Sequence, residues 1–271
     1  MKLDYGTLQS PGSIMLSLGT FRKPKLREIF DDLGYDIYQM YITFIQIKPK
    51  EVYEKIMPDL ADEWNKFGDT QKESVSMFDV IETNEKIREI YNSLFNFFLE
   101  EQVIYIQGAF LILSNYDGEI GHIKDDDVKG IIFKDNFDEI VDIIRQICCI
   151  ASDDEDKKIT EEKEPIFKNA LAKKLWDKIK KGEEEKKKIQ KSRNKNYYIP
   201  NIISSVASRH NSLNYTNIYE LTMFQLIESF NRLRANEIYD ISSRSVSVWG
   251  SKDNEFDDNL WYKNTFDSSA D

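Results

Sequence analysis

The chain contains two imidazoles, those of His122 and His210, and any catalysis by histidine would have to use one of them. Such catalysis needs a serine or cysteine nucleophile within hydrogen-bonding reach of the ring. His210 lies in SSVASRHNS, one or two helical turns after Ser204, Ser205 and Ser208. Serines with this spacing more often line the polar face of a helix or cap its end. The sequence therefore does not favour a serine–histidine pair.

The two cysteines, Cys148 and Cys149, are adjacent, which limits the sulfur chemistry open to the chain. A disulfide framework needs separated partners, and a bridge between neighbours is strained. A zinc site needs four nitrogen or sulfur ligands at recognisable spacing, and two distant histidines with one cysteine pair do not supply it. We expect both cysteines to act as small apolar residues in a buried helix, and we expect no metal.

Acidic clusters are abundant, but none has the spacing of a known ion site. Asp125–Asp127 and the cluster Asp253, Glu255, Asp257 and Asp258 lack the alternating ligands, central glycine and terminal glutamate of an EF-hand loop. Neither GxxxxGK[ST] nor GxGxxG occurs in the chain. Paired carboxylates for glycoside hydrolysis stay open, because nothing in the sequence selects or excludes a pair. We predict no cofactor and no catalytic residue, and therefore a protein that is not an enzyme.

Composition restricts the class of partner. The formal net charge is −11, which argues against nucleic acid, because phosphate binding depends on Lys and Arg contacts that release counterions. The 41% hydrophobic and 13% aromatic content is that of a chain with a real core. No apolar run approaches the roughly 18 residues that span a bilayer, and MKLDYGTLQSPGS lacks the pattern of a signal peptide. We expect a cytoplasmic protein without membrane contact.

The first half of the chain predicts an arm followed by a helical domain. Residues 1–24, rich in Gly and Pro, predict an extended arm that lies over its own domain or reaches a neighbouring chain. Residues 25–151 predict a mainly helical domain, because apolar residues recur at helical spacing over most of it. Its helices include 135–150, and a β-hairpin is predicted near 103–115, where β-branched and aromatic residues surround a Gln-Gly pair.

Two helix starts in this domain carry capping residues. Ser76 precedes the apolar run MFDVIE, and Thr83 or Asn84 precedes EKIREIYNSLFNFFLE. Ser, Thr and Asn side chains accept hydrogen bonds from the free N–H groups of a first helical turn.

The segment 152–196 predicts a charged linker and a long basic helix. It contains 15 Lys and Arg against 11 Asp and Glu, so it is basic on an otherwise acidic chain. From Pro165 the helix has a narrow apolar stripe that would suit an acidic or amphipathic partner, although a plain solvated helix between two lobes is the alternative. The candidate partner-binding residues here are Phe167, Leu171, Leu175, Trp176 and Ile179.

Residues 197–271 predict a helical module with an aromatic tail. A helix should begin near Pro200, and a second should be capped by Thr216 or Asn217, with Glu220 at capping-box distance from Asn217. The alternating Ser and Val residues before Gly250 predict an extended strand. Exposed aromatic residues near a terminus are candidate contact anchors, although the tail could instead bury them against its own helices. The candidates are Trp249, Trp261 and Tyr262.

The predicted fold class is therefore mainly α with a small β-hairpin (α+β). It has a helical N-terminal lobe, a long charged helix and a helical C-terminal lobe.

Several stretches resemble a family of tail-gene-cluster proteins from long-tailed phages and prophages of Gram-positive bacteria. The likeness is carried by LGTFRKPKLREI (18–29), PNIISSVASRH (200–210), NIYELTMFQLIESFNRL (217–233), and SVSVWG with NLWYKNTF (245–250 and 259–266). IYNSLFNFFLEEQVIY (90–105) and RQICCI (145–150) add to it. None of these stretches encodes a reaction mechanism.

The resemblance implies a role in tail morphogenesis in the cytoplasm of the bacterial host. Members of this group are regarded as tail proteins or as tail assembly chaperones that coat the long helical tape measure protein. The implied partners are the tape measure and tail-tube proteins, and homo-oligomerisation stays open. Two alternatives also stay open, a structural component of the tail or head–tail junction and a regulatory or anti-host interaction protein. The arm and the aromatic tail depart from the simpler helical chaperones and suit a virion subunit equally.

Overall fold

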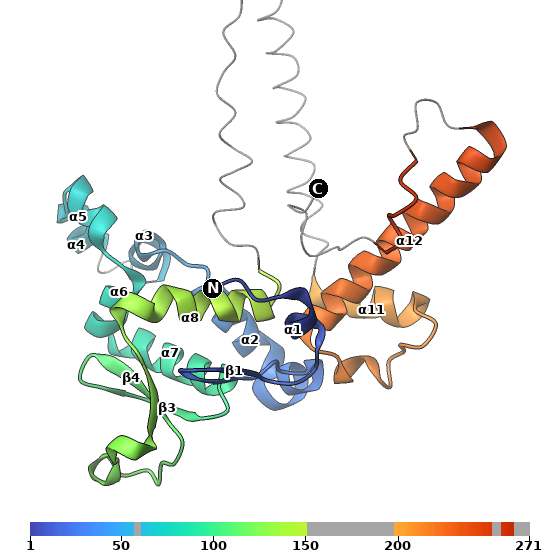
Figure 1. Ribbon diagram of the computed structural model, residues 1–271. Helices are drawn as coiled ribbons and strands as arrows, with labels where there is room; N and C mark the ends of the chain where they lie inside the picture. Colours follow the sequence, from blue (N-terminus) through green and yellow to red (C-terminus); the bar gives the residue numbers. More distant parts are fainter. Residues whose placement is uncertain (57–60, 151–197, 251–255, 263–271) are drawn as a thin grey trace, which may run out of the picture. The chain divides into compact units, whose positions relative to one another are not determined.

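The computed structural model describes residues 1–56, 61–150, 198–250 and 256–262 (Figure 1). The chain divides into two units. Unit 1 comprises Met1–Ile150 with Glu220–Phe224, and unit 2 comprises Ala151–Tyr219 with Gln225–Asp271. The predicted charged helix within 152–196 lies outside the described residues.

Unit 1 begins with a short helix and a β-hairpin. Helix α1 (Tyr5–Gln9) is capped by Asp4, whose carboxylate accepts a 2.9 Å hydrogen bond from the Thr7 N–H. Strands β1 (Ile14–Leu16) and β2 (Gly19–Phe21) then pair antiparallel. The sequence prediction for 1–24 contained neither this helix nor this hairpin.

Most of unit 1 is helical. Its longest helices are α7 (Glu85–Phe98) and α8 (Lys134–Ile147). Two predicted caps are confirmed, because Ser76 and Asn84 accept hydrogen bonds from the N–H groups of Asp79 in α6 (Met77–Thr83) and Ile87 in α7. The helical segments after the first hairpin are η1 (Glu28–Gly34), α2 (Tyr35–Phe44), α3 (Pro49–Glu51), η2 (Val52–Ile56), α4 (Ala61–Lys66), α5 (Asp69–Ser74), α6 (Met77–Thr83), α7 (Glu85–Phe98), η4 (Ile120–His122), η5 (Asp125–Asp127) and α8 (Lys134–Ile147).

The core of unit 1 is rich in aromatic rings. Phe95 of α7 and Phe110 pack edge to face, with 5.1 Å between ring centroids. Phe78 of α6 and Phe137 of α8 also pack edge to face, with 5.5 Å between ring centroids. Such edge-to-face pairs add to the stabilisation from buried area. The buried hydroxyl of Tyr91 donates a 2.6 Å hydrogen bond to the carbonyl of Phe44, so α2 and α7 are joined within the core.

A three-stranded antiparallel sheet packs against these helices, in the order β3 (Gln102–Ile106), β4 (Ala109–Leu113), β5 (Val128–Ile132). The turn between β3 and β4 consists of Gln107 and Gly108, with φ of 48° and 86°. Two consecutive positive φ angles are those of a type I′ turn, whose twist matches that of the strands. The predicted β-hairpin is therefore confirmed.

The first hairpin packs closely on this sheet. A Cβ atom built on Gly130 of β5 would overlap the carbonyl of Leu18, in the β1–β2 turn. Glu101, just before β3, accepts hydrogen bonds from the N–H (2.8 Å) and hydroxyl (2.9 Å) of Thr20, and it forms an ion pair with Lys129. A glycine and a buried polar cluster thus attach the hairpin to the sheet.

Unit 2 contains α11 (Ile199–Arg209) and most of α12 (Met223–Trp249), with η6 (Ile218–Glu220) between them. The predicted helix at Pro200 is confirmed. The predicted cap at Thr216 or Asn217 is wrong, because α12 begins later and the Glu220 carboxylate instead forms ion pairs with Lys25 (2.7 Å) and Arg27 (2.9 Å) within unit 1.

The predicted Ser/Val strand before Gly250 is also wrong, because α12 continues through it to Trp249. Alternation over a few residues resembles a strand, but Ile238, Ile241 and Val248 share one helical face at spacings of three and seven. The serine hydroxyls are satisfied within the helix, since Ser247 donates a 2.8 Å hydrogen bond to the carbonyl of Ser243. The chain is mainly helical with small antiparallel sheets, so the predicted α+β fold class is confirmed.

Candidate functional site

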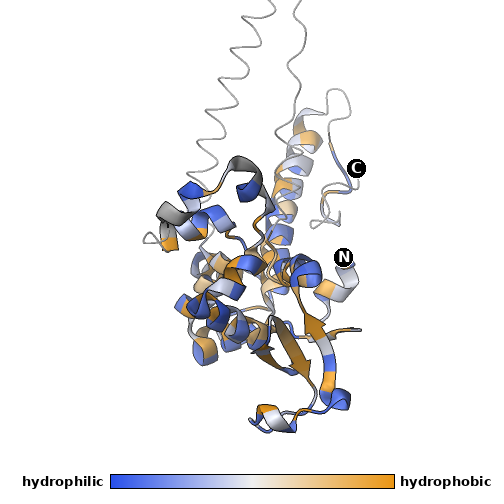
Figure 2. Cartoon of the chain, turned by 90° about the vertical axis from the view of Figure 1, so that its left-hand side faces the viewer, coloured by the Kyte–Doolittle hydropathy of each residue, from blue (hydrophilic) through white to orange (hydrophobic). Residues whose placement is uncertain are grey.

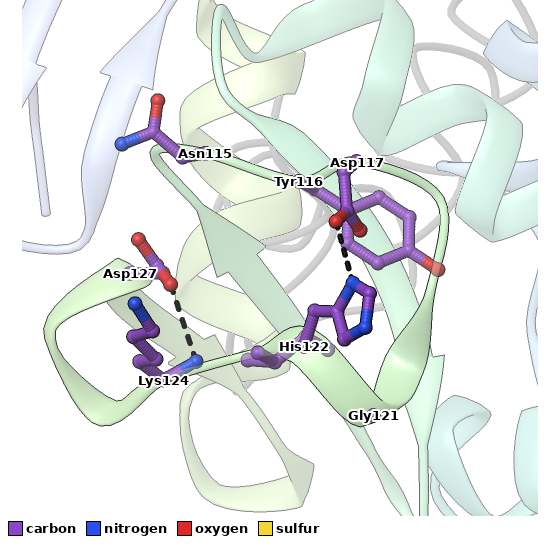
Figure 3. Close-up of a pocket in the computed structure, with 8 residues that line it drawn as sticks. Asn115, Tyr116, Asp117, Gly121, His122, Lys124 and Asp127 are labelled. Atoms are coloured by element: carbon purple, nitrogen blue, oxygen red, sulfur yellow. Dashed lines mark hydrogen bonds and ion pairs between the residues drawn. The ribbon is translucent and has the colours of Figure 1, made fainter.

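An open depression of about 670 Å³ lies in the loop that joins β4 to β5 (Figure 3). The imidazole of His122 lies within it, with Nδ1 2.8 Å from a carboxylate oxygen of Asp117. The loop returns to the sheet through the carbonyl of Asp127, which accepts a 2.8 Å hydrogen bond from the Ser114 N–H. The lining residues are Asn115, Tyr116, Asp117, Gly121, His122, Ile123, Lys124 and Asp127.

Both ring nitrogens of His122 are engaged by carboxylates. Nδ1 faces Asp117, and Nε2 lies 3.2 Å from a carboxylate oxygen of Glu119. The pKa of Asp117 is held below its ordinary value, first by the hydrogen bond from the Glu119 N–H and then by that from His122. In this arrangement each ring nitrogen of His122 lies within hydrogen-bonding or ion-pair distance of a carboxylate from the same loop.

His210 has a local structural role at the end of α11. Its Nδ1 accepts hydrogen bonds from the backbone N–H groups of Ser212 (3.2 Å) and Leu213 (3.1 Å). Ser204 and Ser205 are engaged elsewhere, with the Tyr215 hydroxyl at 2.8 Å and with the Asn201 carbonyl at 2.8 Å. The imidazole therefore orders the turn that follows α11.

The two cysteines lie at the carboxyl end of α8. Cys148 is buried, and burial raises the pKa of its thiol to about 12, so it is unreactive at neutral pH. Cys149 is partly exposed. Among the residues that the structure describes, no group of three or more His, Cys, Asp or Glu side chains is placed to hold a metal ion.

An exposed apolar surface covers the second half of α12. Its members are Ile238, Ile241, Val248 and Trp249, which we call the α12 face. The first three are spaced as the a and d positions of a heptad, and Trp249 adjoins Val248. Trp249 is 84% exposed, the highest fraction among the predicted anchors that the structure describes.

The segment 256–262 lies against the other side of α12. The Phe256 ring centroid is 5.5 Å from that of Tyr239, and Arg232 donates a 3.1 Å hydrogen bond to the carbonyl of Trp261. At about 100° per residue, Arg232 and Ile241 lie on opposite sides of the helix, so the α12 face points away from this segment. The segment thus leaves the α12 face open.

The predicted partner-binding residues divide into two groups. Trp249, Trp261 and Tyr262 are all exposed, and the rings of the last two meet edge to face at 5.0 Å. The other five, Phe167, Leu171, Leu175, Trp176 and Ile179, lie outside the described residues. Sequence reasoning did not identify Ile238 and Ile241, although their spacing from Val248 was a readable signal once the segment was taken as a helix.

In the described ranges, no helix combines the length and apolar character needed to cross a membrane.

Comparison with known proteins gives one finding for the C-terminal part. Residues 186–266 match the family model described as the YomV second domain, a phage-derived domain. The matched segment contains α11, α12 and residues 256–262, and it supports a phage origin for the chain. No curated protein and no solved structure matches the chain.

Proposed function

We propose that this chain is a non-catalytic phage protein that binds other proteins during tail morphogenesis. Its role would be that of a tail assembly chaperone, with the tape measure or tail-tube protein as partner. The observation that carries the proposal is the α12 face, an exposed apolar stripe within the segment that matches a phage-derived domain. Protein interfaces are enriched in large apolar and aromatic anchors of this kind.

The stripe suits a helical partner. Ile238, Ile241 and Val248 repeat at heptad spacing, which is the pattern that one helix presents to another. The amphipathic stripe of a long helical client would cover these side chains by packing along α12.

The first experiment tests where the protein acts. Phage particles and infected-cell extracts are analysed by quantitative mass spectrometry, together with affinity purification of the tagged full chain. A chaperone co-purifies with tape measure or tail-tube protein from extracts and is absent from purified particles. Stoichiometric presence in particles would overturn the chaperone role and establish the alternative, a structural component of the tail or head–tail junction.

A second experiment tests the surface. Ile241→Glu places a charge in the centre of the α12 face, and Ser247→Glu places the same charge elsewhere on the helix. Both positions are exposed, so both variants should fold. The proposal requires Ile241→Glu to lose the co-purified tail protein while Ser247→Glu retains it. Equal retention by the two variants would remove the α12 face from the interaction.

A third experiment addresses catalysis. His122→Ala and His210→Ala should leave phage yield unchanged when the folded protein is present at normal level. A loss of yield with intact folding would revive an enzymatic function.

A further inference from the structure

The sheet of unit 1 has apolar residues on both faces. Its strands read QVIYI, AFLIL and VKGII, and the first two lack the apolar–polar alternation of a sheet that faces water on one side. Nearly continuous apolar strands are typical of sheets with both faces covered. The sequence of the sheet therefore indicates that each face contacts protein.

The inner face is covered within unit 1. Phe110, Ile112 and Ile132 are fully buried on this face, where α6, α7, α8 and the first hairpin pack. Successive residues of a strand point to opposite faces, so their neighbours Leu111 and Ile131 point outward.

The outer face carries a row of three aliphatic side chains, which the register places side by side. Ile104 pairs with Leu111, and Leu111 pairs with Ile131. Ile131 is 41% exposed, and Phe133, two residues further on, is 42% exposed. Ile104 and Leu111 are partly exposed, and the strands have the hydrophobic colour in Figure 2. We call Ile104, Leu111, Ile131 and Phe133 the outer sheet face.

On each edge of the sheet, an asparagine side chain bonds to the backbone groups of the edge strand. The side-chain amide of Asn96 bonds both the N–H and the carbonyl of Val103 on β3. On the other edge, Asn136 donates a 2.8 Å hydrogen bond to the Ile131 carbonyl and accepts one of 2.8 Å from the Phe133 N–H. A partner would therefore pack on the face through side chains, and pairing of backbone at the edges is blocked at these positions.

The charge around the outer sheet face indicates the sign of the partner. Residues 1–150 contain 16 Lys and Arg against 27 Asp and Glu. The loop between β4 and β5 continues directly from Leu113 and leads into Val128, so it lies at one end of this face. Four exposed acids extend from it, against one exposed lysine, Lys124: Asp117, Glu119, Asp125 and Asp126.

We propose that the outer sheet face binds one basic amphipathic helix of a partner protein. Three strands about 4.8 Å apart present a row about 10 Å across, which matches the diameter of a single helix. The apolar side of the helix covers Ile104, Leu111 and Ile131, and its cations lie near the acidic loop. A second copy of the chain is disfavoured, because two acidic surfaces would repel each other. This inference goes beyond the proposed function, since it involves neither α12 nor a phage partner.

The test uses the full chain and two synthetic helical peptides. The first peptide has leucines along one side of its helix and lysines along the other. The second peptide has the same leucines, with glutamates in place of the lysines. We expect the Leu/Lys peptide alone to bind, measured by fluorescence anisotropy. Replacing Leu111→Thr and Ile131→Thr together should weaken this binding at least about tenfold, because threonine keeps the strand and removes apolar surface.

Two control variants accompany the test. Met15→Thr removes an apolar side chain that is 84% exposed and outside the face, and it should leave affinity unchanged. Ile131→Thr alone serves if circular dichroism shows that the double variant is unfolded, and it should weaken binding measurably. Equal affinity of the wild type and a folded Thr variant would overturn the proposal. So would wild-type self-association in sedimentation that the Thr variant abolishes, because the occupant would then be a second copy.

Discussion

The side-chain amide of Asn96 makes both hydrogen bonds that a neighbouring strand would make with Val103. Its Nδ2 donates to the Val103 carbonyl at 2.7 Å, and its Oδ1 accepts from the Val103 N–H at 2.9 Å. The two-residue turn makes Ile106 and Ala109 a hydrogen-bonded pair. Hydrogen-bonded and non-hydrogen-bonded pairs alternate along an antiparallel ladder, so the N–H and carbonyl of Val103 point away from β4, toward the open edge. One residue of α7 thus ends the sheet at β3.

Replacing Asn96→Leu should destabilise unit 1 and expose an edge. Two backbone groups lose their partners, at a cost of about 1–3 kcal/mol, and the freed edge favours association between chains. Urea unfolding measures the first effect, and light scattering during heating measures the second. Asn92→Leu, one turn earlier on α7, is the matched control, because the buried Oδ1 of Asn92 meets no hydrogen-bond donor among the described residues. Similar losses for the two variants would contradict the role of Asn96.

Replacing Gly130→Ala should separate the first hairpin from the sheet. The added methyl group would overlap the carbonyl carbon and oxygen of Leu18, and backbone cannot move aside as a flexible side chain does. We expect a loss of about 1–3 kcal/mol in the free energy of unfolding. Gly121→Ala is the control, because a methyl group there meets no described atom within 4 Å. If the two alanine variants unfold at the same urea concentration, the close approach of Gly130 to Leu18 does not contribute to the free energy of unfolding.

The parts of unit 1 that the sequence predicted are those encoded by local patterns. Ser76 and Asn84 cap helices through residues three positions away, and the Gln107–Gly108 turn is set by its own residues. The first hairpin was not predicted, because it is held by contacts such as those of Thr20 with Glu101, which are 81 residues apart. A local pattern carries no information about such a distant partner.

The candidate surfaces also divide into those that a local sequence pattern predicts and those that depend on distant contacts. The exposed aromatic residues of the tail were identifiable by type, whereas the outer sheet face required the pairing of Ile104, Leu111 and Ile131 across three strands. In α12, a short alternation of Ser and Val competed with a longer helical period, and the longer period prevailed because the helix already extended from Met223.

Replacing Cys149→Gly should stabilise the protein. Cys149 has a φ of 55° and occupies the left-handed position that follows a helix, where Ile150 N bonds to the Arg145 carbonyl and Cys149 N to the Gln146 carbonyl. This is the Schellman arrangement, in which glycine is usual because a Cβ atom costs about 1 kcal/mol. We expect a gain of up to about 1 kcal/mol in urea unfolding. Cys149→Ala separates the effect of the thiol from that of the backbone strain, since alanine removes the thiol but keeps the Cβ atom that strains the left-handed conformation. A gain in the alanine variant equal to that in the glycine variant would attribute the effect to the thiol.

Replacing Glu101→Gln should remove a contribution to stability that depends on pH. The Glu101 side chain is only 8% exposed, and burial alone would raise its pKa. The hydrogen bonds from Lys129 and Thr20 outweigh burial and hold the pKa below its ordinary value of 4.5. Because the folded state binds the proton less tightly than the unfolded state, the stabilisation is complete above the ordinary pKa. It is lost as the pH falls from there through the lower folded pKa.

The measurement is the urea midpoint of wild type and Glu101→Gln between pH 7 and pH 2, roughly the range over which a carboxylate titrates. At neutral pH the wild type should be more stable by about 1–2 kcal/mol, because glutamine has one acceptor oxygen for the two Thr20 donors and loses the charge that faces Lys129. The difference should shrink below pH 4.5, since a protonated Glu101 and a glutamine at the same position are both uncharged. Other carboxylates titrate equally in both proteins, so the difference isolates this one. A gap that stays constant to the lowest pH would show that packing, and not the charge of Glu101, attaches the hairpin to the sheet.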